Sequence, residues 1–468
     1  MRDKLATAGD GRIMDFLERA LGWVEADQAE VVLRTGEESL TRYANNAIHQ
    51  NVAEKSGEAR IRAVLGRKVG LACTGDLSEE GIKAAAREAV AIARLQPDNP
   101  DFKSLVSKED FEAVGAPAAP PAPPAPVPVF AAPRTAEFSP EDRADAVKGI
   151  IDRAKSRGLV AAGAYTTAVG EIAIGNTLGV RAHTPLTSAS LTAVVMSETG
   201  SGYADSHSRD VTRIDPSAVA IEAVEKCLAN REPVAIDPGE FEVILEEYAV
   251  AELTEYLNYL GFGARSLQEG HSFMSGMLGR KVMDSRVTIH DDGLDPVGNP
   301  LPFDLEGVPK QQVTLIDEGV ARDVVWDSFT AGREKRTKAK GPRRSTGHAM
   351  AGGPFAQNLF MAAGSAQKQQ MVADCERGLL ITRFHYVRAV HPTRTVITGM
   401  TRDGTFLVEH GKIIGPVKNF RFTQSITEAF SDVRQVGRTR KIQGGMFGAV
   451  VVPAMHLGRF NFTGRTEH

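Results

Sequence analysis

Cysteine is scarce in this sequence. Its 468 residues include only three cysteines, Cys73, Cys227 and Cys375, which lie far apart and form no Cys-x-x-Cys pair. Such a set excludes a disulfide-stapled secreted fold and gives no sign of a structural zinc site built from paired cysteines. We therefore predict a reduced, cytoplasmic protein in which the three thiols are buried as small apolar side chains.

Long apolar runs and an excess of positive charge are also missing. No stretch approaches the roughly 18 uninterrupted apolar residues of a membrane-spanning helix. Residues 1–11 carry charges of both signs and lack the apolar segment of a secretory signal. The net charge of −4 does not favour general binding to nucleic acid. We therefore expect neither a membrane nor a nucleic acid as partner.

The chain is long enough for at least two domains. In its first half, short strand patterns at residues 29–34, 40–49, 59–64 and 70–74 precede an amphipathic helix over residues 78–94, which Ser78 caps. Further strands and two helices, over residues 140–156 and 215–230, follow. The polar, small-residue segment 197–205 reads as a loop. We predict a mixed α/β domain over residues 1–235, a sheet with covering helices.

A proline- and alanine-rich tract interrupts this first domain. Residues 115–134 read GAPAAPPAPPAPVPVFAAPR, which can form neither a helix interior nor a central strand. An extended connector or loop inside the first domain is the interpretation we adopt, with a proline-rich ligand for another protein as the alternative.

The second half, residues 236–468, changes character. A strand at residues 241–245 leads into a long helix over residues 246–260. Short strands with Gly, Pro and Asp turns follow, which is typical of an antiparallel, barrel-like sheet. The predicted strands cover residues 287–290, 312–317, 320–325, 379–387, 395–398 and 448–452. The predicted fold class of the whole chain is α+β.

Residues 398–422 carry the densest strand and turn signals. Two apolar runs flank His410-Gly411, a dipeptide suited to a tight hairpin turn. Arg402-Asp403-Gly404 reads as a further turn, and residues 417–422 alternate as a strand. The sequence GTFLVEHGKIIGPVKNFRF, residues 404–422, resembles the C-terminal signature of the TldD/PmbA (TldE) family, also called modulator of DNA gyrase.

Two segments of the first half extend this resemblance. RYANNAIHQN (residues 42–51) is similar to the family pattern R-F-A-N-N-x-I-x-Q-N, and GLACTGDL (residues 70–77) is similar to G-x-A-S-T-N-D-L. The sequence is thus identified as a member of the family, whose best understood members form a bacterial metallopeptidase. The resemblance implies a mixed α/β first domain, a β-rich peptidase-like second domain and a peptide substrate.

The zinc motif of the family is missing. In catalytic TldD-like members the helix equivalent to residues 246–260 carries H-E-x-x-x-H, in which two imidazoles bind zinc and the glutamate acts as general base. A cysteine near the C-terminus completes that site. Here residues 247–252 read EYAVAE, none of the eleven histidines precedes a glutamate, and no cysteine follows Cys375. We expect no catalytic residue and no metal in this chain.

The resemblance therefore favours the PmbA/TldE-like branch, which lacks the motif and acts beside a metal-bearing subunit. STGHA, residues 345–349, resembles the K-S-T-G-H-A segment of that branch. The expected partners are a TldD-like homologous subunit, which would carry the zinc, or a second copy of this chain, with unfolded peptide as substrate. Peptide would lie as an added strand on the C-terminal sheet.

Seven residues are candidates for contact with peptide or partner. Four lie in a Gly-rich loop, where polar side chains often serve binding; the others lie on the helix or near the hairpin. They are Ser345, Thr346, Gly347, His348, Glu247, Glu252 and His385. For the glutamates we favour a solvated helix face over a Mg²⁺ site, and for His385 a structural role.

Two other functions stay open from the sequence. The first is a self-standing metal-dependent hydrolase with a rebuilt site that uses His290, Asp292, His348 or His385. The spacing of these residues does not support a metal site, and Asp-Asp-Gly after a strand is typical of a turn. The second is an adaptor for a client such as gyrase, in which residues 333–344, with seven basic residues in twelve, bind an acidic partner. A solvated loop is the simpler interpretation of that segment.

Overall fold

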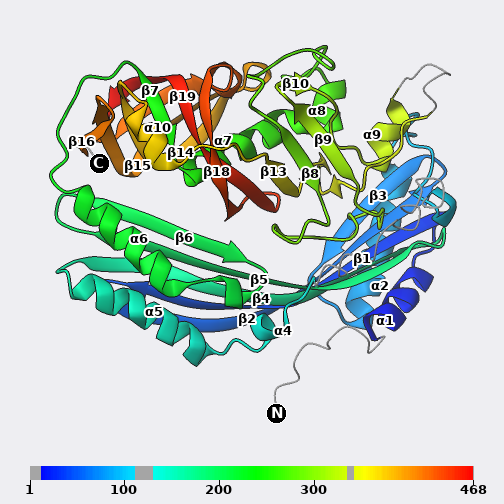
Figure 1. Ribbon diagram of the computed structural model, residues 1–468. Coiled ribbons are helices and arrows are strands. Elements are labelled where there is room, and N and C mark those ends of the chain that lie inside the picture. The colour runs from blue at the N-terminus through cyan, green and yellow to red at the C-terminus, as the bar shows by residue number, and fades with distance from the viewer. Residues whose placement is uncertain (1–11, 111–129, 335–341, 467–468) are drawn as a thin grey trace, which may run out of the picture.

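Two large β-sheets with helices on their faces and one short two-stranded sheet build the described part of the protein, and the fold class is α+β as the sequence predicts (Figure 1). The computed structural model describes residues 12–110, 130–334 and 342–466. Most of the Pro/Ala tract and of the basic segment 333–344 lies outside the described residues. No helix in the described part of the chain is long and apolar enough to cross a membrane.

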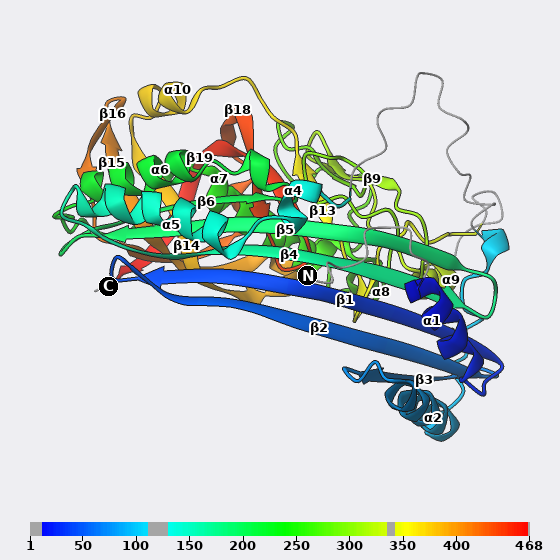
Figure 2. The same ribbon diagram turned by 90° about the horizontal axis from the view of Figure 1, so that it is seen from below.

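The first sheet has six antiparallel strands in the order β3-β2-β1-β4-β5-β6. Its long strands run side by side along the molecule (Figure 2). Asn45 and Asn46, both with positive φ, form the tight turn between β1 and β2. The strands are β1 (Gln28–Ala44), β2 (Ala47–Leu65), β3 (Lys68–Thr74), β4 (Val160–Asn176), β5 (Arg181–Met196) and β6 (Ser201–Ser208).

Helices cover one face of this sheet in two groups. The apolar sides of α1 and α2 pack near β1–β3 around Val31 and Ile61, and those of α5 and α6 pack on β4–β6 around Tyr165 and Leu191. On the opposite face, Val32 and Ile174 contact Phe303 from the second half of the chain. The helices are α1 (Arg12–Gly22), α2 (Glu79–Leu95), α4 (Pro133–Ala136), α5 (Pro140–Lys155) and α6 (Pro216–Ala229), with a 3-10 turn at Val211–Arg213.

The prediction of a loop over residues 197–205 is wrong for its second half, because strand β6 begins at Ser201. The face of the strand toward α6 carries small residues such as Gly202 and Ala204, because the helix packs directly on the strand backbone. A side chain added at Gly202 would lie 2.2 Å from the carbonyl oxygen of Ala223. Small residues are required there, and they conceal the strand pattern.

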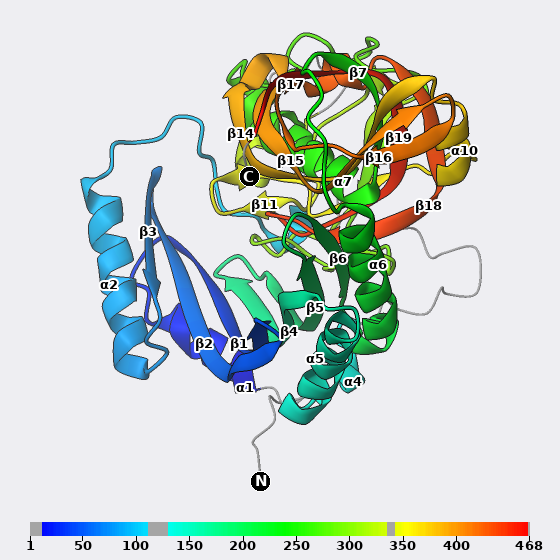
Figure 3. The same ribbon diagram turned by 90° about the vertical axis from the view of Figure 1, so that its left-hand side faces the viewer.

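The second sheet closes into a barrel. Strands β7, β14, β15, β17 and β19 follow one another in pairing order, and β19 pairs back with β7, which closes the ring seen in Figure 3. β13, β8, β9 and β10 continue the sheet from β19. The predicted antiparallel barrel is confirmed except that β7–β14 and β13–β19 pair in parallel.

The elements of this half are the following. The strands are β7 (Glu240–Leu245), β8 (Ile289–Asp292), β9 (Gln312–Asp317), β10 (Val320–Ala321), β11 (Ala349–Met350), β12 (Gly353–Pro354), β13 (Asn358–Met361), β14 (Arg377–His391), β15 (Val396–Glu409), β16 (Lys412–Pro416), β17 (Phe420–Ser425), β18 (Val433–Gly444) and β19 (Ala449–Arg465). The helices are α7 (Glu247–Leu257) with a π-helical turn at Asn258–Phe262, α8 (Ala264–Gln268), α9 (Ser328–Arg333), α10 (Lys368–Ala373) and α11 (Ile426–Ala429), with a 3-10 turn at Pro392–Arg394.

The sequence correctly predicts the hairpin but misreads the segment before it. His410 and Gly411, with φ of 48° and 74°, form the turn between β15 and β16. Residues 402–404 lie inside β15 rather than in a turn. Asp403 has a φ of 58°, and the pairing register with β14 shifts beside it, so the segment is a bulge. The bulge directs the Asp403 carboxylate to Arg383, 2.6 Å away.

Buried charges join the two halves of the chain. Arg62 on β2 donates to Glu30 on β1 at 2.7 Å and lies 3.5 Å from Glu306, which follows the second-half core residue Leu305. The first sheet ends before α6 and the second begins at Glu240. We retain the division into domains 1–235 and 236–468 as a proposal on this basis.

Candidate functional site

Helix α7 places one row of side chains in the core and another in a pocket. Ala249, Val250, Leu253 and Leu257 recur at helical spacing and are buried in the barrel core. On the other side Tyr248, Glu252, Glu255 and Tyr256 line a pocket of about 420 Å³. The helix therefore presents two carboxylates, one turn apart, to a cavity.

The other walls of the pocket come from both halves of the chain. Strand β6 contributes Tyr203 and Asp205, whereas β14 contributes Arg383 and Arg388. The end of β18 and the start of the turn after it, residues 443–446, close a further side. The pocket thus lies between the first sheet and the barrel, and it carries charges of both signs.

Burial favours the neutral form of the two carboxyl groups. It raises the pKa of Glu255 to about 7, against the effect of the backbone N–H groups of Met446 and Phe447. Burial also raises the pKa of Glu252, opposed by the nearby Arg383 and Arg388. Near neutral pH, Glu255 can therefore either donate or accept a hydrogen bond, which suits contact with the polar main chain of a peptide.

The residues in place of the family motif do not fit a zinc ion. Glu247, at the expected first imidazole, is buried and lies 3.0 Å from the Lys368 ammonium. Tyr248, in place of the general base, donates to Glu222 at 3.0 Å and accepts from Lys441 at 2.6 Å. Lys368 neutralises the Glu247 carboxylate, and two charged groups hold the Tyr248 phenol. These side chains cannot replace the imidazoles and the general base of a zinc site.

The prediction of a solvated glutamate face is also wrong. Glu246 and Glu247 are buried, and both contact Lys368 at 3.0 Å. Glu246 also lies 2.6 Å from Lys226 on α6. Charges of α6 and α7 thus neutralise one another where the two halves of the chain meet. Local sequence patterns give no sign of such a long-range network.

We expect Lys226→Met to lower the free energy of unfolding by about 2 kcal/mol, because the buried Glu246 loses one of its two cations. Lys368 still faces Glu246 and limits the loss. Denaturant unfolding measures the effect, with Lys155→Met at the end of α5 as the matched control. Equal stability of the two variants would contradict the role assigned to this pair.

The loop that resembles the TldE-like segment is buried instead of exposed. The side chain of His348 is 0% exposed, and its Nε2 lies 2.7 Å from Asp291. Thr346 lies 3.0 Å from the other ring nitrogen, and Ser345 donates to the carbonyl oxygen of Trp326. Gly347 provides a turn with a φ of 77°. Ser345, Gly347 and His348 are buried and Thr346 is half-buried, so their contacts hold the loop against the domain. Contact of these four residues with peptide or a partner stays a prediction.

The remaining predicted residues divide between the pocket and its surroundings. Glu252 lines the pocket, whereas Glu247 and His385 do not. The His385 ring packs against Tyr386, with centroids 4.2 Å apart, and His290 stacks on Phe360. Among the described residues, the histidines and Asp292 considered for a rebuilt site do not gather as a group of three ligands.

Sequence reasoning missed several residues of the pocket. Glu255 was considered only with the helix glutamates and not as a contact residue, although it lies three residues after Glu252 and seven after Tyr248, on the same helix face. Tyr203 and Asp205 could not be found, since their strand was read as a loop. Arg383 lies on a predicted strand, but nothing local shows that its side chain faces α7.

Comparison with known proteins assigns the family. Three family models match consecutive parts of the chain: PmbA/TldA metallopeptidase domain 1 over residues 29–93, the central domain over residues 133–231 and the C-terminal domain over residues 238–464. Two solved structures show the same fold, each at 19% identity and a TM-score of 0.81. TldE of Thermococcus kodakarensis matches 97% of this chain and 100% of its own. A Thermotoga maritima protein named as a modulator of DNA gyrase matches 96% of this chain and 100% of its own.

Curated relatives carry metalloprotease names. A TldD homologue of Buchnera aphidicola from Acyrthosiphon pisum is 26% identical over 48% of this chain, and the match spans about half of the relative, 46% of its length. From Haemophilus influenzae, a TldD homologue is 25% identical over 82% of this chain and 80% of its own, and a PmbA homologue is 23% identical over 81% and 80%. The chain belongs to the PmbA/TldD family of metallopeptidase homologues.

Proposed function

We propose that this chain is a non-catalytic, TldE-like subunit of a cytoplasmic metallopeptidase assembly that degrades or matures unfolded peptides. The catalytic zinc belongs to a TldD-like homologous subunit. One observation carries the proposal: at the helix position of the zinc motif, the Glu247 carboxylate is buried and paired with Lys368. A second copy of this chain takes the partner's place in the absence of that subunit.

The pocket beside α7 supports a role in holding peptide. It presents carboxylates from Glu252 and Glu255 and a guanidinium from Arg383, groups that pair with the N–H, C=O and charged side chains of an extended chain. In the described part of the chain, β18 pairs with β19 alone, apart from a bridge between Ala366 and Gly437. A peptide strand that pairs with the unpaired edge of β18 would lead into the pocket at residues 443–446.

Peptide binding by the isolated chain tests this role. A fluorescent unfolded peptide should bind wild type, and Glu252→Arg, which fills the pocket and reverses a charge, should weaken binding by at least about tenfold, or 1.4 kcal/mol. Glu428→Arg makes the same exchange at an exposed position of α11 and should bind as wild type does. Equal affinity of both variants would remove the pocket from the proposal.

Assembly is tested separately by size-exclusion chromatography with an HExxxH-bearing homologue from the same genome. The proposal predicts a mixed complex at equimolar ratio. Separate elution at all concentrations would contradict the subunit role. No observation on the described residues favours an adaptor for gyrase.

A further inference from the structure

Strand register brings Glu242 and His456 to one face of the barrel wall. His456 on β19 pairs with Ile244 on β7, and Glu242 lies two residues before Ile244. Residues two apart on a strand share a face, so the side chains of Glu242 and His456 point the same way. The intervening Val243 points to the barrel core. Glu242 and His456 therefore lie on the outer face of the wall, opposite the face on which α7 packs.

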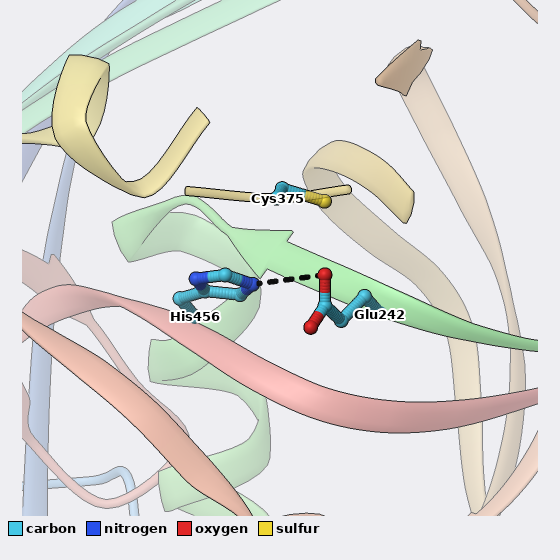
Figure 4. Close-up of side chains that lie close together, drawn as sticks. All are labelled: Glu242, Cys375 and His456. Atoms are coloured by element: carbon cyan, nitrogen blue, oxygen red, sulfur yellow. Dashed lines mark ion pairs between the residues drawn. The ribbon is translucent and has the colours of Figure 1, made fainter. Parts of the chain in front are cut away.

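A glycine in the neighbouring strand leaves space for Cys375 beside these two side chains. Gly378 on β14 pairs with Glu242, and a side chain at Gly378 would lie 2.7 Å from the Cys375 sulfur. Cys375 follows α10, and its carbonyl oxygen accepts a hydrogen bond from Gly411 of the hairpin turn. Because position 378 lacks a side chain, the Cys375 thiol packs beside the carboxylate of Glu242 (Figure 4).

His456 is buried without a hydrogen-bond partner. Its side chain is 2% exposed, and among the described residues no group hydrogen-bonds to either ring nitrogen. Buried imidazoles normally have at least one partner, and leaving a polar group unsatisfied costs about 1–3 kcal/mol. Its Nε2 lies 3.6 Å from the Glu242 carboxylate, too far for a hydrogen bond. The ring therefore lies beside a carboxylate and a thiol without a hydrogen bond, an arrangement that a ligand shared by the three groups would satisfy.

The distances fit a metal ion. With bonds of about 2.0–2.3 Å, two ligands of a tetrahedral zinc ion lie about 3.3–3.8 Å apart, which matches the 3.6 Å between His456 and Glu242. The ligand atoms of Glu242, Cys375 and His456 all lie within 4.8 Å of one another, the one such group of three in the described part of the chain. The widest spacing therefore exceeds the tetrahedral range by about 1 Å at most, so small side-chain movements close the set.

We propose that Glu242, Cys375 and His456 bind one zinc ion on the outer face of the barrel. A sulfur, an imidazole nitrogen and a carboxylate oxygen form a ligand set that favours zinc over calcium or magnesium. The thiol releases its proton to solvent on binding. The Glu242 side chain is 23% exposed, which leaves a path for the ion and a position for a water as fourth ligand.

This site differs from the one the family motif would form. It uses none of residues 247–252 and lies across the β7 strand from α7. The ion would tie β7 and β19 to the turn after α10, and it requires no peptide and no partner subunit. The inference therefore does not rest on the proposed function, although it replaces the expectation that this chain binds no metal.

Cobalt substitution tests the site on the full chain. After removal of metal by a chelator, Co²⁺ should give a thiolate-to-cobalt charge-transfer band, which zinc abolishes at about one equivalent per chain. Cys375→Ser, nearly isosteric, should lose the band, and Glu242→Gln should weaken zinc binding at least about tenfold. Zinc should raise the melting temperature of wild type but not that of Cys375→Ser.

Cys227→Ser is the matched control, because Cys227 is also a fully buried thiol but lies on α6 in the first half of the chain. It should retain both the cobalt band and the zinc-dependent rise in melting temperature. The proposal is overturned if wild type gives no thiolate-to-cobalt band, or if the band survives in Cys375→Ser. Circular dichroism of the metal-free variants shows whether they are folded.

Discussion

Replacing Arg62 with methionine should lower the free energy of unfolding by about 4 kcal/mol, the largest loss we expect from a single charge. Arg62 is 16% exposed and lies 2.7 Å from Glu30 and 3.5 Å from Glu306, which are 3% and 6% exposed. Without the guanidinium, two buried carboxylates lose their cation, and Glu306 keeps only the hydrogen bonds from the backbone N–H and hydroxyl of Ser328. Burial already raises the pKa of Glu30, so the variant is expected to take up a proton, which limits the loss.

Denaturant unfolding at neutral pH measures this effect. Arg67→Met, at an exposed position in the turn between β2 and β3, is the matched control and should change stability by less than about 0.5 kcal/mol. The double variant Arg62→Met/Glu306→Gln should recover part of the loss, since one buried charge is removed with its partner. A loss below about 1 kcal/mol for Arg62→Met would show that the two halves do not depend on this contact.

Glu255→Gln should remove a large pH dependence of stability. Burial raises the pKa of Glu255 from 4.5 to about 7, so the folded chain binds a proton that the unfolded chain releases between these values. The stability contributed by the protonated form is fully present below pH 4.5 and is lost as pH rises through about 7. The shift of about 2.5 units corresponds to about 3 kcal/mol.

Urea unfolding of wild type and Glu255→Gln between pH 4.5 and 8 tests this expectation. The stability of the variant relative to wild type should increase by about 3 kcal/mol as pH rises across this range. Glu428→Gln, exposed on α11, should follow wild type at every pH. Parallel curves of unfolding free energy against pH for Glu255→Gln and wild type would contradict the raised pKa. They would mean that the carboxyl group is charged throughout and that solvent reaches it in the pocket.

Local periodicity and turn chemistry predicted much of the fold. The apolar spacing of residues 78–94 and 246–260 correctly placed α2 and α7, and Ser78 caps α2 as expected, accepting from the backbone N–H of Gly81. The strand predicted at residues 312–317 coincides with β9. These signals depend on residues that are neighbours in the chain, so they can be recognised from the sequence alone.

The charged contacts of the site were not predictable in this way. Glu246 and Glu247 look like a solvated helix start, yet partners 122 and 121 residues away at Lys368 make them buried ion pairs. His348 looks exposed in its Gly-rich loop, but Asp291 lies 57 positions before it and holds it in the interior. Such pairs are set by tertiary packing, which overrides local patterns.

Cleavage of an unfolded peptide most directly tests the claim that this chain is the non-catalytic subunit. The assay compares the chain alone, an HExxxH-bearing homologue alone and their mixture, each with and without a chelator. We predict that the chain alone cleaves nothing, and that the mixture cleaves faster than the homologue alone and is inhibited by the chelator. Chelator-sensitive cleavage by the chain alone would contradict the account.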